Sequence, residues 1–204
     1  LMKSANNILD PNPDPLRIAV LVLDECNTLS FAAAVDPMRA ANRIAGRRLF
    51  DWSYVTPVGT DVQLTSGIAV AGPPLARQDA CDLLLVVAGF ALERQATPAL
   101  RASLRRIAAS GAMLAGIDGG PWLLADAGLL DGYRATPHWE DLDRFASRFP
   151  AVTTLRHRYH IDGARMTSGG AAPAIDMMLH LIRSRYGAKL AERVAGVFIY
   201  DSAP

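Results

Sequence analysis

A largely apolar segment that passes through a glycine pair directly into a helical segment is the feature that most restricts this fold. Residues 113–117 are mostly apolar, and Gly119-Gly120 and then Pro121 follow. Paired glycines permit a turn tight enough to join a buried strand to a helix, and proline suits the first helical turn. The sequence therefore predicts a strand–turn–helix unit with Asp118 at its crest, above the carboxyl edge of a sheet.

Two further continuous apolar runs, at 17–23 and 83–88, have the composition of parallel strands that are buried on both faces. Helical segments are expected to alternate with these strands. The main ones are at 29–44, where Pro37 is expected to kink or restart the helix, and at 98–110, 171–186 and 188–200. This alternation predicts an α/β fold, a three-layer sandwich with a mostly parallel central sheet between helices.

The length and composition fit one globular domain. The chain has 204 residues, of which 50% are hydrophobic and 20% are charged, values that are ordinary for a chain with a sizeable core. Residues 1–16 are polar and rich in proline, and we expect a flexible lead-in there. Residues 17–200 are expected to form the domain.

Charge and cysteine content argue against several classes of protein. Lysine and arginine total 21 against 20 acids, a balance without the basic footprint of a nucleic-acid-binding segment. Cys26 and Cys81 are too few for a disulfide framework and fit a reducing, cytoplasmic compartment, each as a small buried thiol. We expect no membrane segment and no signal peptide, because no apolar run approaches the roughly 20 residues that a bilayer requires.

Three loops are expected to meet Asp118, because the carboxyl ends of parallel strands share one edge of a sheet. These loops are residues 27–30, 89–90 and 136–140. The backbone N–H groups of the second loop, together with that of Gly119, are candidates for an anion hole.

The side chains of these loops combine a carboxylate with aromatic rings. Phe90, Trp122 and Trp139 are expected near Asp118, and a carboxylate flanked by aromatic faces suits a cation, above all a quaternary ammonium. Structural alternatives remain open: Asp118 as a helix cap, the tryptophans as core residues, and His138 as a core or helix-entry residue.

No metal or cofactor is expected. His157, His160 and His180 are scattered and lack the spacing of metal ligands. Gly169-Gly170 precedes a helix, but neither a GxGxxG nor a P-loop pattern is present to support a phosphate site.

Three motifs together resemble the class I glutamine amidotransferase-like, PfpI-like superfamily, which has a flavodoxin-like architecture. They resemble still more closely the amino-terminal sensor domain of AraC-type transcriptional regulators built on that fold. The motifs are the crest at 116–124, AGLLDGYRATPHWE at 127–140 and MTSGGAAPAIDMMLHLI at 166–182. The resemblance implies that 201–204 begin a linker to a carboxy-terminal helix-turn-helix domain, absent from this chain, through which alone DNA is bound.

The chain departs from the hydrolases of this superfamily at the residues that carry catalysis. The resemblance places Asp118 where the hydrolases have a cysteine, Gly119 where many have a histidine, and Ser30 where many have a glutamate. Aspartate is a poor nucleophile for amide chemistry, and no base follows it. His138 matches a histidine that non-catalytic members also carry. We therefore expect no catalytic residues and no enzyme activity, but a retained ligand pocket.

The resulting hypothesis is a non-catalytic, ligand-sensing regulatory domain. An aspartate crest combined with His-Trp-Glu at 138–140 resembles regulators that respond to glycine betaine, dimethylglycine or carnitine, so a small nitrogenous effector is expected. Its contacts are expected from Asp118, Gly119, Trp122, Phe90, His138, Trp139, Asn27 and Ser30. The family also implies a homodimer, which an exposed apolar face on 171–186 would support.

Two alternatives belong to other functional classes. One is a PfpI-like hydrolase or hydratase that uses Cys26 or Asp118, which rapid labelling of Cys26 and hydrolysis of simple amides would support. The other is a dimerisation module with an empty pocket, whose interface would be the last two helices.

Overall fold

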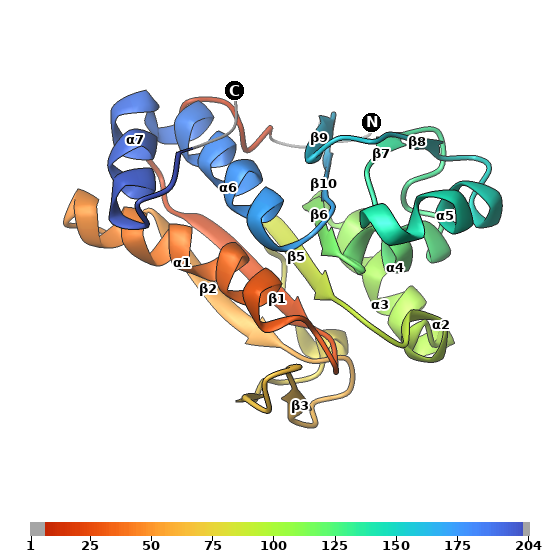
Figure 1. The fold of residues 1–204 in the computed structure, drawn as a ribbon. Coiled ribbons are helices and arrows are strands. Elements are labelled where there is room, and N and C mark those ends of the chain that lie inside the picture. The colour runs from red at the N-terminus through yellow and green to blue at the C-terminus, as the bar shows by residue number, and fades with distance from the viewer. Residues whose placement is uncertain (1–6, 202–204) are drawn as a thin grey trace.

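Six strands form the central sheet of the computed structural model, which describes residues 7–201 (Figure 1). Every neighbouring pair is parallel except the last, which is antiparallel. In sheet order the strands are β2 (Phe50–Val55), β1 (Leu16–Val22), β5 (Leu83–Ala88), β6 (Met113–Asp118), β10 (Arg165–Ser168) and β9 (Tyr159–Asp162). The predicted mostly parallel sheet is confirmed.

Helices cover both faces of this sheet. Figure 1 shows α1 (Thr28–Ala45), α6 (Ala171–Tyr186) and α7 (Ala188–Val197) on one face. The other face carries α3 (Pro98–Ala109), α4 (Gly120–Asp126) and α5 (Leu142–Arg148). The smaller elements are β3 (Val62–Gln63), β4 (Ala69–Val70), α2 (Leu92–Gln95), β7 (Arg134–Ala135), β8 (Thr153–Thr154) and the 3-10 turns Leu75–Arg77 and Trp139–Asp141.

Successive side chains of each central strand enter opposite cores. In β1, Ile18 and Val20 pack in the core beneath α1 and α6, whereas Ala19 and Leu21 pack in the core beneath α3 and α4. Because side chains alternate between the two faces of a strand, a strand between two helical layers must be apolar throughout. This requirement explains the unbroken apolar runs in the sequence.

α1 runs through Pro37 as a single helix of 18 residues, so of the two outcomes expected there, a kink or a restart, the restart does not occur. Asn27 caps its first turn by accepting a hydrogen bond from the Leu29 N–H, and Gly46 ends it in a left-handed conformation. Proline removes one backbone hydrogen bond from a helix. Packing of α1 against α6, α7 and the sheet holds the helix together despite this loss.

α6 is enclosed by its neighbours and lacks the exposed apolar face that would have supported a dimer. It packs against α1 and α7, and its apolar residues Met177, Met178, Leu181 and Ile182 are fully buried. Among the described residues, none of the large exposed apolar side chains belongs to α6. The helix therefore offers no support for a dimer through this face.

The described part of the lead-in is docked rather than loose. Ile8 is buried in the core beneath α1 and α6. Arg185 donates hydrogen bonds to the carbonyls of Ile8 and Asp14, and the Tyr186 hydroxyl bonds to the Asp14 carbonyl. Residues 1–6 of the expected lead-in and 202–204 of the expected linker lie outside the described residues. No helix within residues 7–201 is long and apolar enough to cross a membrane.

The closest approach between α4 and the sheet supplies a test of the fold. A Cβ atom added to Gly120 would lie 2.1 Å from the Val86 carbonyl oxygen, so Gly120→Ala should lower the free energy of unfolding by about 3 kcal/mol or more. Gly196 also lies in a helix but has nothing within 4 Å of an added Cβ. Gly196→Ala should therefore be neutral or stabilise by up to about 1 kcal/mol. Equal urea midpoints for the two variants would contradict this packing.

Candidate functional site

Asp118 occupies the crest of the strand–turn–helix unit in a strained conformation. It is the last residue of β6 and has φ of 60°, a left-handed value that is uncommon outside glycine and often marks a functional site. The following helix begins at Gly120 without a side-chain cap. The structure therefore excludes the helix-cap alternative for this carboxylate.

A buried hydroxyl holds the Asp118 carboxylate in place. Ser30, which is fully buried, donates a hydrogen bond to Asp118 Oδ2 at 2.8 Å and accepts one from the Ala171 N–H at 3.0 Å. Gly170 packs against the same carboxylate, and a Cβ added to it would lie 3.0 Å from Asp118 Cγ. Ser30 thus links the crest to the first turn of α6.

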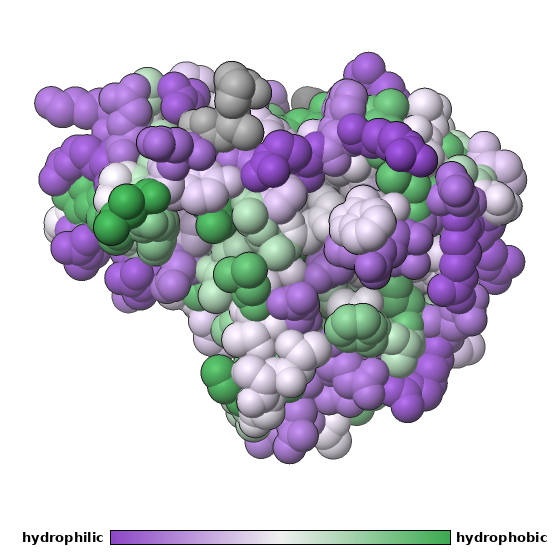
Figure 2. All heavy atoms as spheres, in the orientation of Figure 1, coloured by the Kyte–Doolittle hydropathy of each residue, from purple (hydrophilic) through white to green (hydrophobic). Residues whose placement is uncertain are grey.

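A cavity of about 640 Å³ opens beside Asp118. Its walls come from the loop after β5, from α2, and from the segment that leads into α5, at the right of Figure 1. In Figure 2, which has the same orientation, hydrophilic and hydrophobic residues lie side by side over this part of the surface. The lining residues are Asn27, Gly89, Phe90, Ala91, Leu92, Glu93, Arg94, Asp118, His138, Trp139, Glu140, Asp141 and Arg144.

Five of the eight predicted site residues line this cavity: Asp118, Asn27, Phe90, His138 and Trp139. The loops expected to converge on the crest therefore do so. The Asn27 side chain also caps α1, and His138 Nδ1 accepts a hydrogen bond from the Glu140 N–H at 3.3 Å.

The other three predicted residues lie behind the cavity wall. Trp122 is 3% exposed and packs edge-to-face against Phe149, with ring centroids 5.1 Å apart, so it belongs to the core beneath α4 and α5. Gly119 lies against Leu92, and Ser30 reaches the site only through Asp118. The prediction that these three residues line the pocket is not met.

One of the three N–H groups of the expected anion hole is already occupied. The Gly119 N–H donates to the Ala88 carbonyl at 2.9 Å, a bond that extends the pairing of β5 with β6. It is therefore not available to an oxyanion.

Sequence reasoning missed four charged residues of the wall. They are Glu93 and Arg94 from α2, and Asp141 and Arg144 from the segment around the start of α5. Each group follows closely after a loop that was expected at the site, at 89–90 and at 136–140. Continuing those loops into the first turn of the next helix would have found them.

The charge of the wall favours a cation. Four carboxylates, those of Glu93, Asp118, Glu140 and Asp141, outnumber the guanidinium groups of Arg94 and Arg144 among the lining residues. Burial raises the pKa of Asp118 above its usual value, although the Ser30 hydrogen bond and the charge of His138 oppose this effect. A desolvated carboxylate gains from a cationic partner.

Two aromatic side chains of the wall are exposed to an unusual degree. Phe90 is 59% exposed and Trp139 is 72% exposed. Large apolar side chains at the mouth of a cavity are typical of a binding site, and their ring faces attract cations that cannot form hydrogen bonds.

Cys26 does not have the properties of a nucleophile. The side chain is fully buried, and burial together with the Asp118 charge raises its pKa to about 12. Thiolate is the reactive form of cysteine. Within residues 7–201, no group of three or more His, Cys, Asp or Glu side chains is placed to hold a metal ion.

We predict that iodoacetamide leaves Cys26 unmodified in the folded protein at about pH 7. With a pKa of about 12, the thiolate fraction would be on the order of 10⁻⁵, and the burial of the thiol also blocks access. Peptide mass spectrometry of protein labelled with and without urea measures this protection. Rapid labelling of the folded protein would contradict it.

Replacing Asp118 by asparagine should stabilise the fold near pH 7. A carboxyl group whose pKa is raised in the folded state destabilises that state increasingly as pH rises from about 3.9, its unfolded value, through the folded pKa. The asparagine side chain would carry no such charge, would tolerate positive φ and could accept the Ser30 bond. The melting temperature of Asp118→Asn should exceed that of the wild type near pH 7, and this gap should close as pH falls.

Asp82→Asn serves as a control, because its expected effect on stability is opposite to that of Asp118→Asn. Burial raises the pKa of Asp82, but hydrogen bonds from the Arg17 side chain and backbone outweigh this effect, so the pKa is lowered. The ionised Asp82 carboxylate stabilises the folded state near pH 7, and this stabilisation is lost only when acid protonates it. Asp82→Asn should therefore be less stable than the wild type near pH 7. A pH-independent gap for Asp118→Asn would show that the crest carboxylate is not desolvated.

Known proteins share this architecture and much of this sequence. Residues 16–184 match the DJ-1/PfpI family. The chain is 41% identical over 183 residues to the HTH-type transcriptional regulator CdhR of Pseudomonas aeruginosa, covering 88% of this chain and 53% of CdhR. It is 36% identical over 193 residues to the HTH-type transcriptional regulator GbdR of the same species, covering 93% of this chain and 52% of GbdR. The chain thus spans about half the length of the curated relatives it matches.

Solved structures agree with the sequence relationship. An AraC family transcriptional regulator from Pseudomonas putida is similar with a TM-score of 0.79 and 27% identity, covering 90% of this chain and 100% of that structure. Drosophila melanogaster DJ-1beta, at 17% identity and a TM-score of 0.77 over 93% of this chain and 100% of its own, shares the fold. The chain belongs to the DJ-1/PfpI family.

Proposed function

We propose that this chain is the ligand-sensing regulatory domain of an AraC-type transcriptional regulator and binds a small nitrogenous cation over Asp118. The observation that carries the proposal is the crest itself. A half-buried, strained carboxylate lies at the position from which the family's hydrolases act, and it faces a cavity with exposed aromatic side chains. Binding at such a site needs no nucleophile.

The chemistry of the wall favours a methylated amine: quaternary glycine betaine or carnitine above all, and also dimethylglycine, whose protonated form is a tertiary ammonium. Asp118 Oδ2 already accepts the Ser30 hydrogen bond, so the carboxylate serves the ligand chiefly as a charge. Phe90 and Trp139 offer ring faces to a cation that has no N–H to donate. His138 lies beside Trp139, with ring centroids 5.9 Å apart, and Asn27 and Gly119 flank the crest.

The relatives support a regulatory role. CdhR and GbdR are named as HTH-type transcriptional regulators, and each is about twice as long as the region it shares with this chain. In the proposal, DNA is bound by a helix-turn-helix domain outside this chain, which agrees with the net charge of +1. The effector would change the conformation, or the geometry of a homodimer, in the cytoplasm, and so reposition that domain.

The enzyme alternative has little support in the site. Cys26 is a buried thiol with a raised pKa. Asp118 is followed by Gly119, which has no side chain to act as a base and whose N–H is already bonded within the sheet. We propose that catalysis is absent and that neither Cys26 nor Asp118 acts as a nucleophile.

Thermal unfolding in the presence of amines tests the proposal. A ligand at about a hundred times its Kd should add about 2.7 kcal/mol of stability, which corresponds to roughly 5–10 °C for a domain of this size. Glycine betaine, dimethylglycine, carnitine and choline form the panel. We expect at least one to stabilise the wild type and to lose most of this effect in Asp118→Asn.

Asp143→Asn is the matched control. Asp143 is exposed on α5, close to the lining residue Asp141, but does not itself line the cavity. The variant should respond to amines as the wild type does. Absence of any shift across the panel, or an undiminished shift in Asp118→Asn, would refute the proposed site, whereas hydrolysis of simple amides would favour the enzyme.

A further inference from the structure

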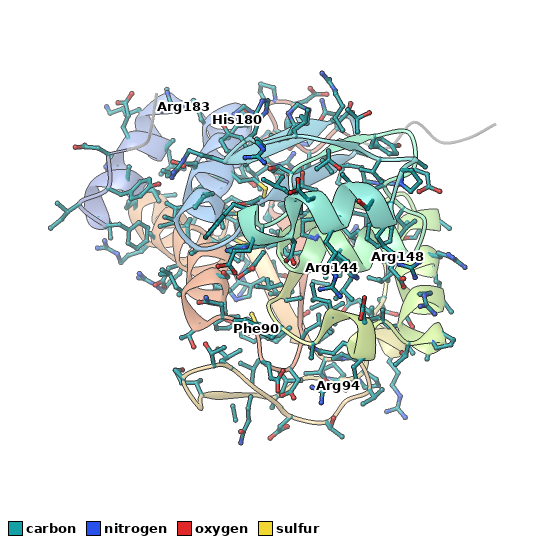
Figure 3. All side chains as sticks on the ribbon, turned by 45° about the vertical axis from the view of Figure 1, so that its right-hand side comes forward. Phe90, Arg94, Arg144, Arg148, His180 and Arg183 are labelled. Atoms are coloured by element: carbon teal, nitrogen blue, oxygen red, sulfur yellow. The ribbon has the colours of Figure 1, made fainter. Side chains whose placement is uncertain are left out.

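Arg144 supplies the cavity with a positive group that a ligand carrying only a cation would leave unused. It lies in the first turns of α5 and lines the same cavity as Asp118 and Phe90 (Figure 3). Its side chain is 58% exposed. A simple amine over Asp118 would gain nothing from this guanidinium and would be repelled by it.

Two contacts hold the Arg144 guanidinium at the wall. Its Nη2 donates to Glu93 Oε1 at 2.6 Å, across the cavity wall from α5 to α2. Its Cζ lies 4.8 Å from the ring centroid of Trp122, over the face of that buried ring. Cation–π stacking and an ion pair together restrict a side chain that is otherwise flexible.

The held guanidinium keeps most of its hydrogen-bonding capacity. Between described residues, the Arg144 side chain makes one hydrogen bond, the one to Glu93. Most of its N–H donors therefore have no protein acceptor there. The planar donor fork of arginine matches the two oxygens of a carboxylate. The other lining arginine, Arg94, is paired at 3.5 Å with Glu25, which does not line the cavity.

We infer that Arg144 binds the carboxylate of the ligand and sets a preference for zwitterionic amines over simple ones. The cationic end would lie against Asp118, Phe90 and Trp139, and the acidic end would lie on the free edge of the Arg144 guanidinium. This inference rests on the proposed function. It adds the acid-binding residue and the requirement that the ligand carry both charges.

Titration calorimetry with the whole chain tests this assignment. The probes are glycine betaine, dimethylglycine and carnitine, each with a carboxylate, and choline, which has the quaternary ammonium without one. The best carboxylate should bind the wild type at least about 10-fold more tightly than choline, because a charge-assisted hydrogen bond contributes that much or more. In Arg144→Met its Kd should rise roughly 10- to 100-fold, while that of choline should not rise.

Arg148 provides the matched control. It lies one turn further along α5, over the ring of Phe149, and does not line the cavity (Figure 3). Arg148→Met removes the same charge from the same helix and should leave every Kd unchanged. Arg144→Lys keeps the charge without the planar fork, and it should restore part of the lost affinity even if Arg144→Met proves unstable.

The outcomes separate this inference from the proposed function. If no probe binds the wild type, the amine-binding function itself fails. If choline binds the wild type as tightly as the best carboxylate, or if Arg144→Met and Arg144→Lys bind that carboxylate like the wild type, the role of Arg144 is refuted and the cation site over Asp118 stands.

Discussion

The left-handed backbone at Asp118 is the constraint on which the site depends. This conformation allows β6 to turn into α4 without a loop. It persists because close packing around the turn holds the backbone in place. Gly120 lies against the Val86 carbonyl, Gly170 lies against the Asp118 carboxylate, and Ser30 joins that carboxylate to the first turn of α6. Strain at one residue is thus held by close contacts from three separate parts of the chain, as expected for a functional position.

The same packing makes the site energetically unfavourable when no ligand is bound. Burial raises the pKa of Asp118 and so disfavours its charge, while Phe90 and Trp139 leave large apolar surfaces in water. Each feature would be relieved by an organic cation, which compensates the carboxylate and covers the rings. The relief of both unfavourable features by one ligand is the physical basis of the proposed effector site. It does not require any covalent bond to be made or broken.

Particular residues show how far sequence reasoning reaches. The turn at 118–120 and the alternating burial of β1 follow from steric limits and side-chain period, which are local properties. Trp122 was placed at the pocket because it lies close to Asp118 in the sequence, yet helical geometry turns it into the opposite core. Pro37 did not restart α1, because packing from α6 and α7, far away in the sequence, outweighs one missing hydrogen bond.

The sequence by itself determined the parallel sheet, the strand–turn–helix unit, the carboxylate at its crest and the loops that meet there. Apolar runs, glycine pairs and the end-to-end order of strands and helices are sufficient for these features. Only the tertiary structure decided that Ser30 supports the carboxylate from behind, that Cys26 is a buried thiol with a raised pKa, and that Arg144 stacks on Trp122 at the wall. Side-chain direction, desolvation and pairing of charges depend on segments that are distant in the chain, and folding alone brings those segments into contact.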